Sequence, residues 1–218
     1  MDALIFDMDG VLVDSVGYWN DVRARVITEA LGVNEVDVSN LVGLNAHDEY
    51  AYLAERNDVE LLKETYVSLL EEHAEEIYRE RVSLFDDYEQ VLTNAIEKDV
   101  RLGLVSASNR RWVEMVVDRF DLGEYFDIVV AGDDVPGPSK PEPAIYNHTL
   151  TQLGATADTC IAIEDSEHGV TAATRAGLYC LGYAHHRGQP LRHADETVGT
   201  EQALYERLIE LCTSDSIP

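Results

Sequence analysis

Acidic side chains follow several short apolar runs of this sequence, and acids gathered at one place could bind a metal ion and attack phosphorus. Asp7 and Asp9 follow the first such run, and Glu164 and Asp165 follow a later one. Like charges at close range are costly unless a cation neutralises them. Carboxylate oxygens without a nearby His or Cys favour Mg²⁺ over zinc. The acids therefore predict magnesium-assisted chemistry, provided that the fold brings them together.

Each of these residues taken alone has a simpler interpretation. An Asp after a strand is often only a helix N-cap or a turn residue. Ser106, which ends another apolar run, is of a type that favours helix starts, and Lys140 could be an exposed loop residue. Lysine is scarce in this chain, because only Lys63, Lys98 and Lys140 occur. The ordered combination of acids, a hydroxyl and this lysine is more specific than any one member.

The elements that must position these residues form an alternating pattern. Short apolar runs that predict buried parallel strands lie at 3–6, 102–105, 128–130, 160–163 and 178–181, and helical stretches lie at 110–120, 144–153 and 167–176. Alternation of this kind predicts an α/β fold with a doubly wound parallel sheet. In open parallel sheets ligands bind beyond the carboxyl ends of the strands. We therefore expect the acids, Ser106 and Lys140 to meet at that edge.

The connection after the first strand breaks the alternation. It carries no strand-like run, and helices are expected at 18–31, 47–56 and 59–80. We expect a helical insertion at 15–82 and an α/β core domain formed by 1–14 and 83–218. The insertion either covers the sheet edge or forms a cap over the site.

The net charge of the chain limits the kinds of partner that it can bind. Its 218 residues include 42 acidic and 16 basic side chains, which gives a net charge of −26. A surface this acidic repels nucleic acid and anionic membranes, and no apolar run of membrane-spanning length occurs. The N-terminus does not resemble a signal peptide. The cysteines (Cys160, Cys180 and Cys212) are odd in number and lack CxxC spacing, so we expect a reduced, cytoplasmic protein without disulfides or a zinc knuckle.

The excess of acid also suggests adaptation to molar salt. Dense carboxylates and scarce lysine keep a surface hydrated and repelling where salt shortens the Debye length to roughly 3 Å. The alternative is an ordinary acidic protein, but a charge of −26 in 218 residues lies far outside the modest charge of a small domain. We therefore favour an origin in a halophile.

Four segments together resemble the motifs of the haloacid dehalogenase (HAD) superfamily. They are FDMDGVLVDS at 6–15, VSAS at 105–108, SKPEPAIY at 139–146 and IEDSEHGV at 163–170. The resemblance covers the whole predicted sheet and implies a Rossmann-like core with an inserted α-helical cap. Ala162 and Ser139 depart from the pattern, because many relatives have Gly at both positions. Neither departure removes a reacting group.

The resemblance implies a phosphatase that forms an aspartyl-phosphate. Asp7 would be the nucleophile, and Asp9 would protonate the leaving oxygen and then deprotonate the attacking water. Asp9 must then stay protonatable while Asp7 is ionised. Mg²⁺ would be held by Asp7, the backbone carbonyl of Asp9 and Asp165, with Glu164 close by.

The same resemblance implies how the substrate is held. Ser106 and Lys140 would bind the phosphoryl oxygens by hydrogen bond and charge. A helix that starts near Asn109 would add backbone N–H donors, and Ala107 completes the expected substrate-binding set. The substrate would be a small phosphorylated metabolite; phosphoglycolate, sugar phosphates and nucleoside monophosphates all remain open, as does the oligomeric state.

Other activities in the superfamily fit less well. Its dehalogenases lack an acid at the position of Asp9. In its beta-phosphoglucomutases a cap His and a cap Arg serve the reaction, and those positions are Trp19 and Ala46 here. We therefore expect a phosphatase of the phosphoglycolate phosphatase-like group, with a beta-phosphoglucomutase-like mutase as the alternative. A response-regulator receiver or a degenerate binding protein are rivals that are not enzymes.

Further residues have two interpretations each. Tyr18 and Trp19 either pack in the core or between domains, or line a pocket under the cap. Arg23, one turn on from Trp19, could face the same cleft. His47 is interpreted as a surface residue at a helix start, and 184–193, which holds three His, as a solvated loop rather than a metal site.

Overall fold

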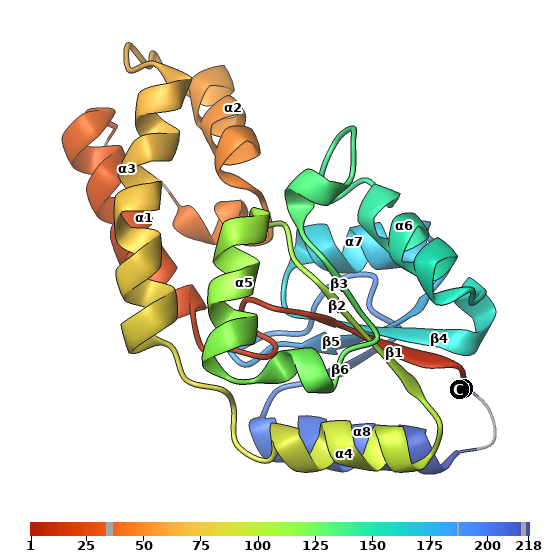
Figure 1. Cartoon of the computed structure of the whole chain (residues 1–218). Helices are drawn as coiled ribbons and strands as arrows, with labels where there is room; N and C mark the ends of the chain where they lie inside the picture. The colour runs from red at the N-terminus through yellow and green to blue at the C-terminus, as the bar shows by residue number, and fades with distance from the viewer. Residues whose placement is uncertain (34–36, 187, 215–216) are drawn as a thin grey trace.

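The computed structural model describes residues 1–33, 37–186, 188–214 and 217–218. Its centre is a six-stranded sheet with the strand order β3-β2-β1-β4-β5-β6, in which every neighbouring pair is parallel (Figure 1). The strands are β1 (Ala3–Asp7), β2 (Arg101–Val105), β3 (Ile128–Val130), β4 (Cys160–Glu164), β5 (Tyr179–Tyr183) and β6 (Glu196–Val198). The prediction of a doubly wound α/β sheet is confirmed.

The helices fall close to the predicted stretches. They are α1 (Val16–Ala30), α2 (Ala46–Arg56), α3 (Lys63–Glu76), α4 (Tyr88–Glu97), α5 (Arg110–Arg119), α6 (Ala144–Leu153), α7 (Glu167–Arg175) and α8 (Glu201–Thr213). The third helix, expected from residue 59, begins at Lys63, because Asn57 and Asp58 favour a turn and Leu62 is still extended. It ends in a π-helical turn, η2 (Ile77–Arg81). The strand β6 and the helices α4 and α8 were not predicted.

The central strand β1 is buried on both faces, which explains its uninterrupted apolar run. Leu4 and Phe6 pack in one core cluster with residues of α4, α5 and α8. Ala3 and Ile5 point to the other face and pack with residues of α6 and α7. The sheet is therefore covered by helices on both sides, as side chains that alternate along a strand require.

The register of the strands brings their carboxyl ends together. Asp7 at the end of β1 lies opposite Val105 at the end of β2, and Phe6 lies opposite Ile163 of β4. The residues that follow these three strands therefore meet at one edge of the sheet.

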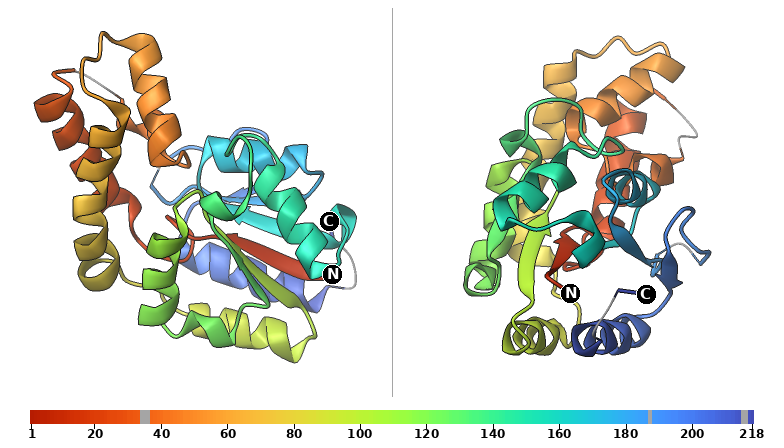
Figure 2. Two further views of the ribbon diagram at one scale, coloured as in Figure 1. Left: turned by 45° about the horizontal axis from the view of Figure 1, so that its top comes forward. Right: turned by 90° about the vertical axis from the view of Figure 1, so that its right-hand side faces the viewer.

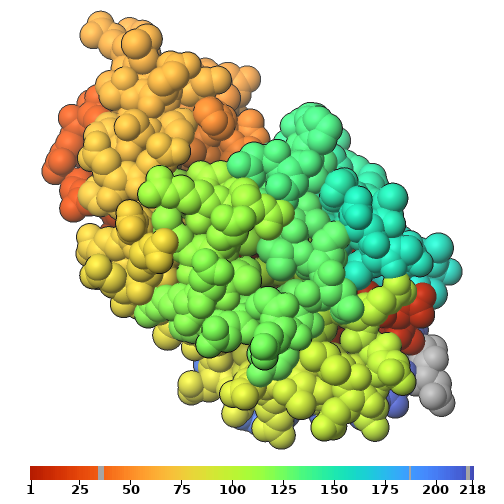
Figure 3. Space-filling view, viewed as in Figure 1, coloured from red at the N-terminus to blue at the C-terminus, as the bar shows by residue number. Residues whose placement is uncertain are grey.

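The helices α1, α2 and α3 lie together beyond the carboxyl end of β1, and both termini lie at the opposite end of the molecule (Figure 2). In the space-filling view they form a lobe that meets the rest of the chain along α5 (Figure 3). Within the described residues, no helix is long and apolar enough to span a membrane.

Candidate active site

A buried lysine joins two of the strand ends. Asp7 ends β1 and Glu164 ends β4, while Lys140 lies in the loop before α6. The ammonium nitrogen Nζ of Lys140 donates to Oδ1 of Asp7 at 2.6 Å and to Oε1 of Glu164 at 2.5 Å. All three side chains are buried, and Lys140 is only 2% exposed. One positive charge is thus fixed between two carboxylates. The expected contact of Lys140 with phosphoryl oxygens stays a prediction.

With a third carboxylate, the cluster carries more negative charge than this one lysine can neutralise. Oxygen atoms of Asp7, Glu164 and Asp165 all lie within 4.8 Å of one another. Burial and the charge of Glu164 raise the pKa of Asp7 to about 8, although Lys140 acts in the opposite direction. Burial, then Asp7 and Glu164, raise the pKa of Asp165 well above its ordinary value. Full ionisation of the cluster therefore requires a further cation.

The donor atoms suit a hard divalent cation. Within the described part of the chain, Oε2 of Glu164 is buried and has no hydrogen-bond partner, and an orphan of this kind is costly unless a ligand satisfies it. The three side chains offer only carboxylate oxygens, which Mg²⁺ prefers. The residues present thus fit the metal that the sequence analysis expected.

The charge state of Lys140 is held by its partners. Burial would lower its pKa, but Asp7 and Glu164 outweigh burial and raise the pKa above its ordinary value, so the side chain stays an ammonium. Tyr146 of α6 also donates to Oε1 of Glu164. Burial and the charge of Glu164 raise the pKa of Tyr146 well above its ordinary value, so its hydroxyl remains a donor.

Two glycines allow the backbone to approach this cluster. Gly10 has a φ of +78°, and a Cβ there would lie 2.2 Å from Oδ2 of Asp165. A Cβ on Gly169 of α7 would lie 1.9 Å from Oε2 of Glu164. Any side chain at either position would displace a carboxylate of the cluster.

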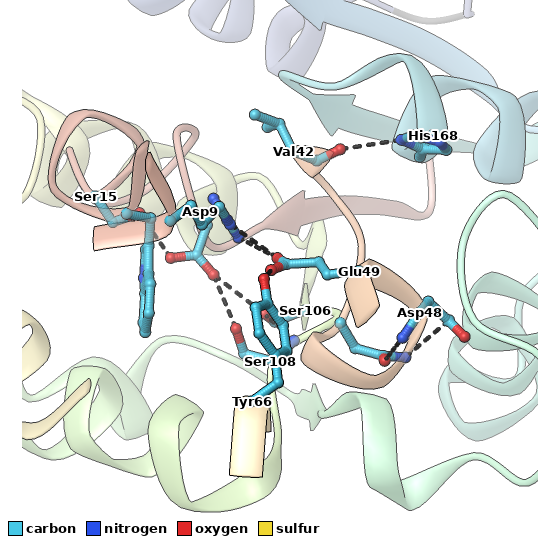
Figure 4. Close-up of polar contacts among 12 residues, drawn as sticks. Asp9, Ser15, Val42, Asp48, Glu49, Tyr66, Ser106, Ser108 and His168 are labelled. Carbon is cyan, nitrogen blue, oxygen red and sulfur yellow. Dashed lines mark hydrogen bonds and ion pairs between the residues drawn. The ribbon is translucent and has the colours of Figure 1, made fainter. Parts of the chain in front are cut away.

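The carboxyl group of Asp9 lies among several hydroxyl groups, including those of Ser15 and Ser108 (Figure 4). Its Oδ1 accepts from Ser15 at 2.6 Å and from Tyr78 at 2.9 Å. Its Oδ2 accepts from Ser108 at 3.1 Å and, more weakly, from Ser106 at 3.5 Å. Asp9 is not one of the three carboxylates that converge, and the metal contact expected through its backbone carbonyl stays a prediction.

The predicted phosphate-binding residues lie beside Asp9 after β2. Ser106 is buried, and its Oγ accepts from the backbone N–H of Ser108 at 3.1 Å. Ala107 lies next to it along the cavity wall and has no polar side chain, so only its backbone can bind a ligand.

The start of α5 offers fewer donors than the sequence suggested. Asn109 is the N-cap, and its side chain accepts from the backbone N–H of Trp112 at 3.0 Å. The backbone N–H of Arg110 donates to Asp133 at 2.7 Å. The backbone N–H groups of Trp112 and Arg110 are thus already bonded within the protein. A substrate could use them only by displacing the side chains that they bind.

A cavity of about 450 Å³ opens above Asp7. It lies between the sheet edge and the helices α1–α3, and α5 contributes a wall. Its lining includes Asp7, Asp9, Ser106 and Asp165 from the sheet side and Trp19, Arg23, His47, Glu49 and Leu70 from the helical side. A space of this size accommodates a small ligand.

The cavity resolves several open interpretations. Trp19 is 3% exposed and lines the cavity, so it serves in packing and in the pocket wall. Arg23 faces the same cleft. His47 is exposed, as expected, but stands at the rim of the cavity. Tyr18 is not among the lining residues and lies under the guanidinium of Arg81.

The helical segment touches the core directly on the far side of the cavity. The imidazole of His168 on α7 donates to the backbone carbonyl of Val42 at 3.0 Å (Figure 4). Ser139, one of the two departures from the family pattern, donates to Asp48 of α2. The other departure, Ala162, is buried inside β4.

The loop at 184–193 is exposed at its histidines, as predicted, and its residue 187 lies outside the described residues. His186 forms an ion pair with Asp14 at 3.4 Å, and His185 packs on Tyr183. The described histidines of this loop are not part of the acidic cluster.

Three groups around Asp9 were missed from the sequence. Ser15 lies in the same motif as Asp9, and Ser108 ends the motif at 105–108. The motifs therefore offered a signal for both residues. Tyr78 is separated from Asp9 by 69 residues and lies in a motif-free helical segment. Only the fold brings it to the site.

The fold and the site together define an α/β protein with an acidic cluster and a buried lysine at the carboxyl ends of its parallel strands. It belongs to the haloacid dehalogenase-like hydrolase family, whose model matches residues 4–183. The family resemblance read from the four motifs is thereby confirmed.

Its relatives include named phosphatases. A phosphorylated carbohydrates phosphatase of Thermotoga maritima is 29% identical and covers 82% of each chain. Hexitol phosphatase B of Escherichia coli is 31% identical over 81% of this chain and 80% of the relative. A HAD family hydrolase of Deinococcus radiodurans, solved with bound phosphate and sodium, has a TM-score of 0.70 and 25% identity over 100% and 99% of the two chains. The prediction of a HAD phosphatase is confirmed, and the mutase alternative is not favoured.

Proposed function

We propose that this enzyme is a Mg²⁺-dependent phosphatase that hydrolyses a small phosphate monoester through an aspartyl-phosphate on Asp7. One observation carries the proposal. The carboxylates of Asp7, Glu164 and Asp165 converge within 4.8 Å, and the ammonium group of Lys140 lies 2.6 Å from Asp7. Asp7 and Asp165 of this cluster line a cavity large enough for a phosphate ester, and Lys140 and Glu164 lie buried behind them.

Asp7, Asp165 and the backbone carbonyl of Asp9 would hold Mg²⁺, with Glu164 close by. When bound, the ion neutralises charge on the phosphoryl oxygens, so that one anion can approach another. Lys140 and Ser106 bind the same oxygens from the protein side. These contacts align phosphorus with the carboxylate of Asp7.

The reaction proceeds in two displacements. A carboxylate oxygen of Asp7 attacks phosphorus, the ester P–O bond breaks, and Asp9 gives its proton to the leaving alkoxide. Asp9 then takes a proton from water as that water attacks phosphorus. The bond between phosphorus and Asp7 breaks, which releases inorganic phosphate and restores both carboxyl groups.

The helical segment 15–82 serves as a cap in this proposal. Its contacts at Val42 and Asp48 hold it against the core, so that it covers one side of the cavity. The leaving group would lie between Trp19 and the other residues that the helices contribute.

The test is hydrolysis of p-nitrophenyl phosphate in molar KCl with and without Mg²⁺, combined with trapping of radiolabelled phosphate on Asp7. Metal-dependent turnover with label on Asp7 is the expected result. A stable acyl phosphate without turnover would instead indicate a phospho-acceptor signalling module. Turnover that persists in EDTA would contradict the role of the metal.

A further inference from the structure

A buried ion pair lies in the cavity wall, apart from the acidic cluster. Arg23 of α1 donates through Nε and Nη2 to Oε1 of Glu49 on α2, at 2.9 and 2.6 Å. The two side chains are 11% and 2% exposed, yet both line the cavity. They lie on the helical side, where the part of the substrate beyond the phosphate must lie.

The pair is held rigidly by its neighbours. Tyr66 of α3 donates to Oε2 of Glu49 at 3.1 Å (Figure 4). The guanidinium of Arg23 lies 5.6 Å from the ring centre of Trp19, which is a favourable cation–π distance. Each charge is therefore balanced before any ligand arrives.

The pair retains unused hydrogen-bonding capacity. A guanidinium has five N–H donors and a carboxylate about four acceptor sites, while the contacts above use two donors and three acceptor sites. Arg23 and Glu49 can thus present a donor and an acceptor side by side without net charge. An alcohol hydroxyl, which both donates and accepts, matches this pairing.

A second anionic group on the substrate does not match this neighbouring donor and acceptor. Such a group only accepts hydrogen bonds, and it would meet the carboxylate of Glu49 next to Arg23. Among the described lining residues the other arginine is Arg111, and it is 71% exposed and paired with Glu75 at 3.6 Å. The described part of the lining thus holds no buried arginine or lysine without a carboxylate partner.

The aromatic part of the remaining wall suits a carbon skeleton. Trp19 stacks on Trp112 with ring centres 5.0 Å apart and an interplanar angle of 20°, and both line the cavity. Aromatic faces pack well against C–H groups, whereas they give no hydrogen bond to a carboxylate or phosphate.

We propose that Arg23 and Glu49 form the leaving-group subsite and select phosphate monoesters of neutral polyhydroxyl compounds over esters that carry a second anionic group. The inference rests on the proposed phosphatase function and narrows its substrate class to sugar and polyol monophosphates. Glu49 determines the specificity, because its charge both accepts from a hydroxyl and repels a second anion.

The experiment compares three substrates at one fixed salt concentration with Mg²⁺: a hexitol phosphate, 2-phosphoglycolate and p-nitrophenyl phosphate. We expect the unmodified enzyme to have at least about a tenfold higher kcat/KM for the hexitol phosphate than for 2-phosphoglycolate. Glu49→Gln should reduce this ratio by at least about tenfold, since it removes the negative charge of Glu49 and leaves the positive charge of Arg23 to attract a second anion. Turnover of p-nitrophenyl phosphate reports whether the reacting groups are intact.

Glu55→Gln is the matched control. Glu55 lies on the same helix and is 74% exposed, paired with Arg56 outside the cavity. The substitution makes the same charge change, so the substrate ratio should stay as in the unmodified enzyme. A ratio that falls equally in both variants would mean that overall charge sets the preference, which overturns the role of the subsite.

The failures of the two proposals are distinguishable. If the unmodified enzyme hydrolyses p-nitrophenyl phosphate but prefers 2-phosphoglycolate, this inference is overturned and the phosphatase function stands. If none of the three esters is hydrolysed, both are overturned. If Glu49→Gln does not fold, the preference of the unmodified enzyme still decides, because it needs no variant.

Discussion

The hydroxyl of Tyr78 donates a hydrogen bond of 2.9 Å to Oδ1 of Asp9. Tyr78 lies in η2, where the chain returns from the helical segment to the core, and Ser15, where the chain leaves the core, bonds the same oxygen at 2.6 Å. Both connections between the helices and the sheet thus place a hydroxyl on one carboxylate. The orientation of Asp9 is therefore coupled to the position of the helical segment.

Tyr78→Phe should lower kcat about tenfold with little change in KM, because it removes one orienting hydrogen bond from the proposed acid and base. Burial and the charge of Asp9 raise the pKa of Tyr78 well above its ordinary value, so the hydroxyl stays a donor throughout the working range. The pH profile of kcat should move with the substitution. Steady-state kinetics from pH 5 to 9 measure both effects.

Tyr50→Phe is the control for this prediction. The Tyr50 hydroxyl donates to the backbone carbonyl of Leu61 within the helical segment, away from Asp9. Its loss should leave kcat and the pH profile unchanged. Equal kinetics for the two variants would show that the contact between Tyr78 and Asp9 has no role in turnover.

Asp7→Asn should reduce turnover by at least about 10³-fold, because an amide cannot act as the nucleophile. The fold should survive, since the amide oxygen can still accept from Lys140 and one charge leaves a crowded buried cluster. Phosphatase assays and thermal unfolding check the two expectations. Asp2→Asn, an exposed change near the opposite end of β1, should retain full activity. Unimpaired activity of Asp7→Asn would reject the assignment.

The sheet and its acidic edge could be predicted because their signals are local. Strands buried on both faces read as continuous apolar runs, and the residue after each run belongs to the carboxyl edge. Asp7, Ser106, Lys140 and Asp165 each follow such a run or precede a helix, so their convergence needed only the topology. The edge strand β6 was not predicted, because its three residues (Glu196–Val198) are half-exposed and carry no apolar run.

The residues that complete the site could not be predicted in the same way. Tyr78 and Glu49 lie in amphipathic helices, where a Tyr or Glu is as ordinary on a solvated face as in a pocket. Their contacts depend on how the helical segment packs against the sheet, and no local pattern specifies that angle. Arg23 was expected to face the cleft from its spacing to Trp19, but its pairing with Glu49 was not.

Without metal, the enzyme should become less stable as pH rises. The pKa of Asp7 is raised from 3.8 to about 8, so between these values the folded state binds more protons than the unfolded state. The free energy of unfolding then falls with rising pH through this window. Thermal unfolding in EDTA at pH 5.5 and 8.5 measures the effect, and the Tm should be lower at pH 8.5.

Mg²⁺ should reverse that loss, because it neutralises the cluster in the folded state only. At 100 times its Kd, an ion adds about 2.7 kcal/mol, which corresponds to a Tm increase of roughly 5–10 °C for a chain of this size. The increase should be larger at pH 8.5 than at pH 5.5. In Asp165→Asn the increase should disappear and the pH dependence should weaken; an unchanged response in this variant would place the ion elsewhere.

High salt should stabilise the protein, because its net charge of −26 makes the folded state repel itself at low ionic strength. On α3 the exposed acids Glu71 and Glu75, and likewise Glu72 and Glu76, stand at i,i+4 spacing, where like charges are destabilising. Thermal unfolding from low to molar KCl at pH 7.5 should therefore show a steady rise in Tm. Near pH 4 the carboxylates lose charge, so the same titration should be much flatter there. An equal Tm at both ends of the series at pH 7.5 would reject adaptation to molar salt and leave an ordinary acidic protein.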